Sequence, residues 1–141
     1  MSISILIFEN FLLLYSLKIS IMSYSKGKIK KFNLKENCIN SRKKEFYYGA
    51  KFNKKIKDVY LGMGFLDPKE ENRKVGPSRK HEEILLVVSG KIKIASKNAE
   101  LILDEGEVYF MPDGQKIKLN NLTEQRSYFI IAGGHTKHHK H

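Results

Sequence analysis

The chain has 141 residues, which fits a single domain and is long enough to bury a sizeable hydrophobic core. A hydrophobic content of 41% excludes a wholly disordered chain, and the single cysteine, Cys38, excludes an intrachain disulfide and is typical of a reducing compartment. The net charge of +11 is uneven: residues 26–57 carry 12 Lys or Arg against two Glu, whereas residues 59–141 carry 13 basic and 11 acidic residues.

The first 22 residues, MSISILIFENFLLLYSLKISIM, are the most hydrophobic part of the chain. A membrane-spanning helix needs about 20 consecutive apolar residues, but Glu9, Asn10 and Lys18 interrupt this run. A signal peptide would begin with positive charge and end in small residues, and neither feature is present. Three alternatives remain: residues 1–21 precede a true start at Met22, form a buried or membrane-peripheral segment, or form a genuine span or signal. In each case we expect the remainder to be cytoplasmic, because the basic flank favours that side of a membrane.

A basic lead-in follows over residues 22–57, and we expect little contribution to the core from it. The triplet Lys-Ile-Lys occurs at 28–30, 55–57, 91–93 and 116–118. Alternation with period two places Ile on the buried face of a strand and both Lys in water, which favours solvated strand faces. The alternative is a nucleic-acid-associated protein. Since no recognition helix or aromatic–basic motif accompanies the charge, we expect nucleic-acid binding to be at most non-specific.

From Phe46 onward the pattern is that of an all-β domain. Short apolar runs are separated by Gly, Pro, Asp, Asn or Ser, and no stretch keeps a 3.6-residue period. Alternation predicts inward-facing residues on each strand, enough to close a double-sheet jelly roll. The predicted inward sets are Ile84, Leu86 and Val88; Ile92 and Ile94; Leu101 and Leu103; Val108 and Phe110; and Ile117 and Leu119.

Two motifs in this region resemble those of the cupin superfamily. The second cupin motif reads Gly, five residues, Pro-x-Gly, two residues, His, three residues, Asn. This chain keeps the register with Gly106, Pro112, Gly114 and Asn121. The first motif ends in Glu, six residues, Gly, which EILLVVSG supplies as Glu83 and Gly90. The resemblance implies a single-domain, cupin-type double-stranded β-helix or jelly-roll barrel with an internal cavity, over residues 58–134, preceded by the basic extension.

The resemblance also implies three metal-binding histidines and one glutamate, of which only Glu83 is in place. Ile117 occupies the histidine position of the second motif, no His-x-His precedes Glu83, and His81 is out of register. A transition metal needs three or four converging N, O or S ligands. We therefore expect no cofactor in the barrel, and we expect Ile117 to pack its interior.

Four residues are candidates for contacting a ligand in the barrel: Arg79, His81, Glu83 and Asn121. A guanidinium at Arg79 could hold a carboxylate or phosphate in a bidentate manner. The alternative is that Arg79 ends a solvated loop or pairs with Glu83, and loop arginines are usually exposed.

The C-terminal segment GGHTKHHKH holds four of the five histidines, and we treat residues 135–141 as a His-rich tail. Its composition suits weak binding of a transition metal through His135, His138, His139 and His141. The alternative is a basic tail without a role.

The function that fits these features is a cytosolic single-domain cupin that binds a small molecule without catalysis, its metal site having been lost. One alternative is a metal-dependent enzyme that uses Glu83, His81 and tail histidines. Another is a nucleic-acid-associated basic protein. We expect a homodimer, because strand exchange pairs cupin barrels, and we expect no membrane partner.

Overall fold

The computed structural model describes residues 30–136, and a compact unit begins at Asn33. Residues 1–29 and 137–141 lie outside the described residues, and with them the apolar segment 1–21 and His138, His139 and His141. Between residues 30 and 136, no helix is long and apolar enough to cross a lipid bilayer. The elements are α2 (Leu34–Ile39), β1 (Glu45–Tyr48), β2 (Tyr60–Leu66), β3 (Arg73–Val75), β4 (His81–Ser89), β5 (Lys91–Ala95), β6 (Glu100–Asp104), β7 (Val108–Met111), β8 (Ile117–Asn121) and β9 (Ser127–His135).

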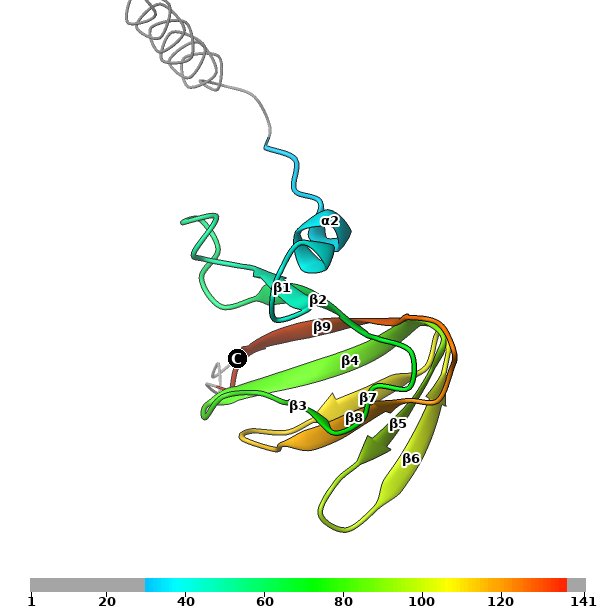
Figure 1. Ribbon diagram of the computed structural model, residues 1–141. Coiled ribbons are helices and arrows are strands. Elements are labelled where there is room, and N and C mark those ends of the chain that lie inside the picture. The colour runs from blue at the N-terminus through cyan, green and yellow to red at the C-terminus, as the bar shows by residue number, and fades with distance from the viewer. Residues whose placement is uncertain (1–29, 137–141) are drawn as a thin grey trace, which may run out of the picture. The chain divides into compact units, whose positions relative to one another are not determined.

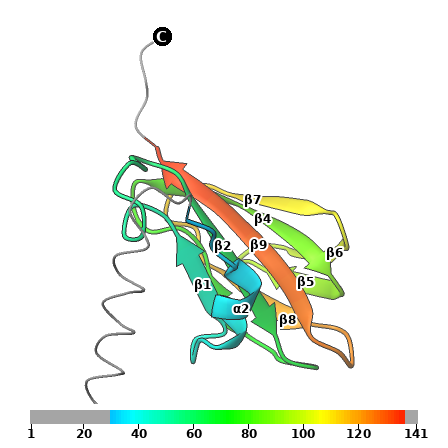
Figure 2. The same cartoon turned by 90° about the horizontal axis from the view of Figure 1, so that it is seen from above.

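The strands form two antiparallel sheets that face each other, which confirms the predicted all-β jelly-roll architecture (Figure 1). The first sheet has the order β1-β2-β9-β4-β7, and these five strands lie side by side in Figure 2. The second sheet has the order β3-β8-β5-β6. The core between the sheets consists of Leu66, Val75, Leu85, Val87, Ile92, Ile94, Leu103, Met111, Ile117, Leu119, Phe129 and Ile131.

The predicted inward faces are correct for β5 and β8 and wrong for β4 and β7. Ile92, Ile94, Ile117 and Leu119 are buried, as expected. On β4 the buried positions are instead Glu83, Leu85 and Val87, and the predicted set is on the outer face. On β7 the predicted residues Val108 and Phe110 face outward, and on β6 only Leu103 of its pair is buried. Both faces of β4 are aliphatic, so a period of two cannot identify the inner one.

The lead-in contributes more structure than the sequence predicts. Helix α2 begins at the N-cap Asn33, whose side chain accepts a hydrogen bond from the backbone N–H of Glu36. The helix packs against β1 and β2, and Cys38 on it is completely buried. Burial, followed by the negative charge of Glu45, raises the pKa of the Cys38 thiol, as expected for an unreactive cysteine. A helix of six residues is too short to show a periodic pattern.

Candidate functional site

The barrel holds a pocket of about 370 Å³ lined by Tyr47, Tyr60, Gly76, Ser78, His81 and Glu83. The tyrosines come from β1 and from the first residue of β2. His81 and Glu83 come from the beginning of β4, and Gly76 and Ser78 come from the loop before it. The pocket therefore lies where the first residues of β2 and β4 meet the β3–β4 loop.

Glu83 is the charged group of this pocket, and only 6% of its surface is exposed. It takes an inward position of β4 because the inner face alternates Glu83, Leu85, Val87. Its Oε1 accepts a hydrogen bond of 2.7 Å from the hydroxyl of Tyr60. Its Oε2 is buried and has no hydrogen-bond partner among residues 30–136. Glu83 thus presents one satisfied and one unsatisfied oxygen.

A glycine between Tyr60 and Glu83 permits their hydrogen bond. Gly133 on β9 is the register partner of Tyr60 on one side and of Glu83 on the other. A Cβ atom at Gly133 would lie 2.4 Å from the Tyr60 hydroxyl. The missing side chain therefore lets the phenol extend across β9 to the carboxylate.

Tyr47 forms the neighbouring wall of the pocket, and a second glycine makes room for it. A Cβ atom at Gly62, its register partner on β2, would lie 2.4 Å from the Tyr47 ring. The Tyr47 and Tyr60 rings meet edge to face with centroids 6.1 Å apart. Burial raises the pKa of both phenols, and the hydrogen bond to Glu83 raises that of Tyr60 further. Both tyrosines therefore stay protonated at neutral pH.

His81 connects the pocket to the end of β9. Its Nδ1 lies 3.0 Å from the carbonyl oxygen of Arg79, and since a carbonyl only accepts, Nδ1 carries the hydrogen. The His81 ring contacts that of His135, its register partner, with centroids 4.2 Å apart and the ring planes tilted by 40°. His135 Nδ1 in turn lies 2.9 Å from Asp58 Oδ1. His135 is therefore the last residue of a strand rather than part of a separate tail.

The other two candidate ligand residues are not brought to the pocket. Arg79 is exposed in the turn before β4 and does not line the pocket. Asn121 is buried at the far end of β2: its amide nitrogen donates to the carbonyl of Asp67 at 2.9 Å, and its Oδ1 accepts from Ser127 Oγ at 2.8 Å. Since Tyr60 begins the seven-residue strand β2 and Asp67 follows it, Asn121 and Glu83 lie near opposite ends of the barrel.

The described residues do not fit the metal centre that the cupin motifs would imply. Across residues 30–136, no group of three or more His, Cys, Asp or Glu is arranged to hold a metal ion. Ile117 is 1% exposed and pairs with Val75, so it packs the core as the sequence predicts. Glu83 and His81 are the two potential ligands in the pocket, one fewer than a stable transition-metal site needs.

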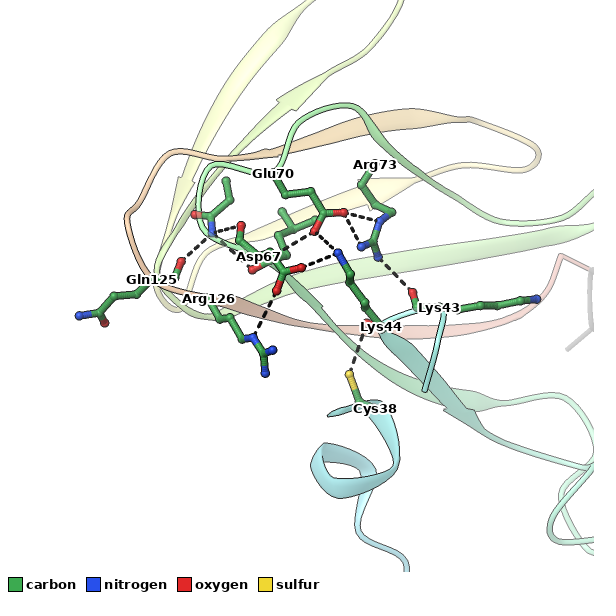
Figure 3. A network of polar contacts seen from close by, with 10 residues as sticks. Cys38, Lys43, Lys44, Asp67, Glu70, Arg73, Gln125 and Arg126 are labelled. Carbon is green, nitrogen blue, oxygen red and sulfur yellow. Dashed lines mark hydrogen bonds and ion pairs between the residues drawn. The ribbon is translucent and has the colours of Figure 1, made fainter. Parts of the chain in front are cut away.

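A second polar cluster, shown in Figure 3, joins the lead-in to the loop after β2. Lys44 forms ion pairs with Asp67 and Glu70, and Arg73 pairs with the other oxygen of Glu70. The hydrogen bond from Lys44 is the main cause of the lowered pKa of Asp67. For Glu70 burial acts to raise the pKa, but the Asp67 N–H, Arg73 and Lys44 together lower it. The charges of these four residues are all paired with one another, and the pairs hold the two segments together.

The outer face of the first sheet carries an apolar stripe of two neighbouring rows. In each row the residues are register partners on β2, β9, β4 and β7. Ile84, Val108 and Phe110 are 48%, 59% and 53% exposed. The rows are Leu61, Ala132, Ile84 and Phe110, and Met63, Ile130, Leu86 and Val108.

Sequence reasoning found His81 and Glu83 and missed Tyr47, Tyr60 and Ser78. Tyr60 lies in the run VYLGMGFL, where nothing distinguishes an aromatic core residue from one whose hydroxyl reaches another strand. The useful signal was the glycine at 133, which permits close approach within a strand. That signal acquires meaning only once the register of β9 is known.

Comparison with known proteins gives the fold. No family model matches the sequence, and no curated protein matches it. Among solved structures, a cupin 2 conserved barrel domain protein from Salinispora arenicola matches with a TM-score of 0.59 and 14% identity, over 76% of this chain and 89% of that one. A cupin protein from Bacteroides fragilis matches with a TM-score of 0.58 and 11% identity, over 79% and 88%.

The cupin domain of Schizosaccharomyces pombe Cnp3 matches with a TM-score of 0.50 and 12% identity, over 55% of this chain and 56% of that one. This chain therefore spans little more than half of the Cnp3 domain. Two facing antiparallel sheets, the glycines at the predicted turns and these similarities lead to one conclusion. The chain has the cupin fold.

Proposed function

We propose that this chain is a cytosolic, non-catalytic cupin whose barrel pocket binds a small organic molecule. The observation that carries the proposal is that Glu83 lines the pocket and that its buried Oε2 has no hydrogen-bond partner among the described residues. A buried polar atom left unsatisfied costs about 1–3 kcal/mol, and more when it is charged. A ligand that donates a hydrogen bond to Oε2 would remove that cost.

The size and lining of the pocket support the same proposal. Ligand pockets commonly have volumes of about 300–1,000 Å³ and combine apolar walls with a few oriented polar groups. This pocket has about 370 Å³, two aromatic walls and the polar groups of Ser78, His81 and Glu83. Its Tyr60–Glu83 hydrogen bond fixes the carboxylate before any ligand arrives, which reduces the entropy lost on binding.

Glu83→Gln should reduce the amount of small molecule that co-purifies with the protein at least about tenfold, because it removes the charged acceptor. Mass spectrometry of the denatured, filtered protein measures this amount. Glu82→Gln is the matched control, because Glu82 is the next residue of β4 but is exposed on the opposite face. The control should retain the wild-type amount. A bound molecule equally abundant in both variants would place the ligand elsewhere.

A metal-dependent enzyme is the second candidate function, and the His81–His135 contact favours it. This contact places a histidine of the C-terminal segment beside one that lines the pocket. The two functions differ in where a bound Zn²⁺ or Ni²⁺ ion would reside. For the non-catalytic cupin it would be on the histidines after residue 136, and for the enzyme it would be on His81 and His135.

Replacing His138, His139 and His141 with Asn in the full chain should abolish metal uptake and leave the unfolding midpoint almost unchanged. Elemental analysis and melting curves measure both quantities. His135→Asn is the comparison variant, and it should leave metal uptake in place. If one equivalent of metal persists until His81 or His135 is replaced, the enzyme is favoured, because a metal bound only to the native state would also raise the midpoint.

We propose that the partner of the apolar stripe is a second copy of this chain. All eight residues of the stripe are uncharged, so this surface offers no ion pairs to a nucleic acid or an acidic protein. Each row spans four strands, and its midpoint lies between β9 and β4. A two-fold axis at that midpoint would place each stripe on its counterpart, as a symmetric dimer requires.

Ile84→Lys should convert a dimer into a monomer, because it buries an unpaired ammonium group in an apolar interface. Size-exclusion chromatography with light scattering measures the mass. Ile102→Lys is the matched control: Ile102 is also an isoleucine, is 50% exposed compared with 48% for Ile84, and lies on the other sheet. That variant should remain dimeric. A wild-type chain that stays monomeric at a concentration of about 10⁻⁴ M would contradict the proposed dimer.

A further inference from the structure

We infer that the ligand of the barrel pocket is a small organic amine, bound by hydrogen bonds from its protonated nitrogen to Oε2 of Glu83. This inference rests on the proposed function and names its ligand class. It differs from the carboxylate or phosphate ligand that Arg79 suggested in the sequence, because Arg79 does not line the pocket.

The charges around the pocket favour a cation. Glu83 is the one acidic lining residue, and the lining contains no Lys or Arg. The nearby ammonium group of Lys116 is already bound, at 2.6 Å to the carbonyl oxygen of Gly76 and at 2.8 Å to that of Pro77. An anionic ligand would therefore meet a buried carboxylate, whereas a cation would neutralise it in a poorly solvated position.

Glu83 and His81 offer hydrogen-bond acceptors to a ligand in the pocket. The hydroxyl group of Tyr60 donates its hydrogen bond to Oε1 of Glu83. While the carboxyl group is ionised, Oε2 can only accept a hydrogen bond. His81 donates through Nδ1 to the Arg79 carbonyl, so a neutral His81 offers Nε2 as a second acceptor. A primary ammonium group supplies three donors, enough to form hydrogen bonds with both of these acceptors.

The tyrosine rings complete the fit to a protonated amine. Tyr47 and Tyr60 stand edge to face beside the carboxylate, and the negative face of an aromatic ring attracts a cation within about 6 Å. Both hydroxyl groups stay protonated, so neither competes with Glu83 as a negative charge. Aromatic walls around one carboxylate are a suitable environment for an ammonium group attached to an apolar body.

Four probes that share one benzyl or phenyl body test the inference by calorimetry with the full chain. They are benzylamine, N,N,N-trimethylbenzylammonium, benzyl alcohol and benzoate. Benzylamine should bind at least about tenfold more tightly than each of the others, because a hydrogen bond to a charged group is worth about 1.5–3 kcal/mol. The trimethylated probe keeps the positive charge and lacks N–H donors, so it separates the hydrogen bond from simple charge attraction. Glu83→Gln should abolish the preference for benzylamine, and Glu82→Gln should retain it.

Because the comparison among probes uses the wild-type protein, it remains decisive even if Glu83→Gln fails to fold. Equal or tighter binding of benzoate or benzyl alcohol would overturn the amine inference and leave the small-molecule function standing. Tight binding of the trimethylated probe would also overturn it, since no N–H would then be needed. If none of the four probes binds and no small molecule co-purifies, both the inference and the proposed function fail.

Discussion

Ile117→Ala should lower the free energy of unfolding by about 2–5 kcal/mol, the range measured when a large buried aliphatic side chain is truncated. Ile117 is 1% exposed and packs between the sheets with Val75 and Leu119 among its neighbours in the core. The surrounding β-sheets are fixed by hydrogen bonds and cannot collapse fully into the cavity. Urea denaturation measures the change.

Ile117→His should also destabilise the barrel, because an imidazole buried there needs hydrogen-bond partners that the aliphatic core does not supply. Ile102→Ala is the control, because Ile102 is 50% exposed and its truncation should change the stability by about 0.5 kcal/mol or less. If Ile117→His were neutral and bound a metal tightly, the remaining ligands would have to converge on position 117. The described histidines, His81 and His135, contact each other on the first sheet, so we expect no such gain.

The sequence was sufficient to predict the barrel, because its turns are specified locally. Gly90, Gly106 and Gly114 all have positive φ angles, as expected where tight turns join strands. The spacing between them is what the cupin motifs describe. The fold could therefore be predicted from a few positions whose backbone geometry favours glycine.

The set of residues that line the pocket could not be predicted from the sequence in the same way, because it depends on the register in which the strands pair. Glu83 was found as part of a motif, but its partner Tyr60 is 23 residues away and reaches it across Gly133. A shift of one residue in the pairing of β2 with β9 would turn Tyr60 to the outer face. No local pattern in the sequence specifies that pairing.

The outer face of β4, which the sequence wrongly predicts to be the inner one, bears on how the protein assembles. Its outer positions Ile84, Leu86 and Val88 are as apolar as its inner ones, so the sequence pattern predicted that they lie in the core. In a barrel that functions alone, the outer positions of a strand would be expected to be polar. An outer face that is as apolar as a core indicates that a further surface covers it, which is the basis for the proposed dimer.

Gly76→Ala should destabilise the protein by about 3 kcal/mol or more and should weaken ligand binding as well. Gly76 has a φ angle of +135°, which side chains rarely tolerate, and a Cβ atom there would lie 2.1 Å from the carbonyl oxygen of Gln115. Because the obstacle is backbone, the β3–β4 loop would have to separate from the β7–β8 loop. That separation would also break the bonds from the Lys116 ammonium group to the carbonyls of Gly76 and Pro77.

Gly106→Ala is the matched control, because Gly106 also has a positive φ angle, +85°, but a Cβ atom there would meet nothing within 4 Å. It should cost only the backbone strain of about 1–2 kcal/mol and leave binding of the benzylamine probe unchanged. Denaturation curves and calorimetry on the two variants separate strain from collision. Equal losses of stability would mean that the β7–β8 loop yields easily to a side chain at position 76. An unaltered affinity in a destabilised Gly76→Ala protein would show that the ligand does not depend on the rim of the pocket, and that Glu83 with the two tyrosines is sufficient to hold it.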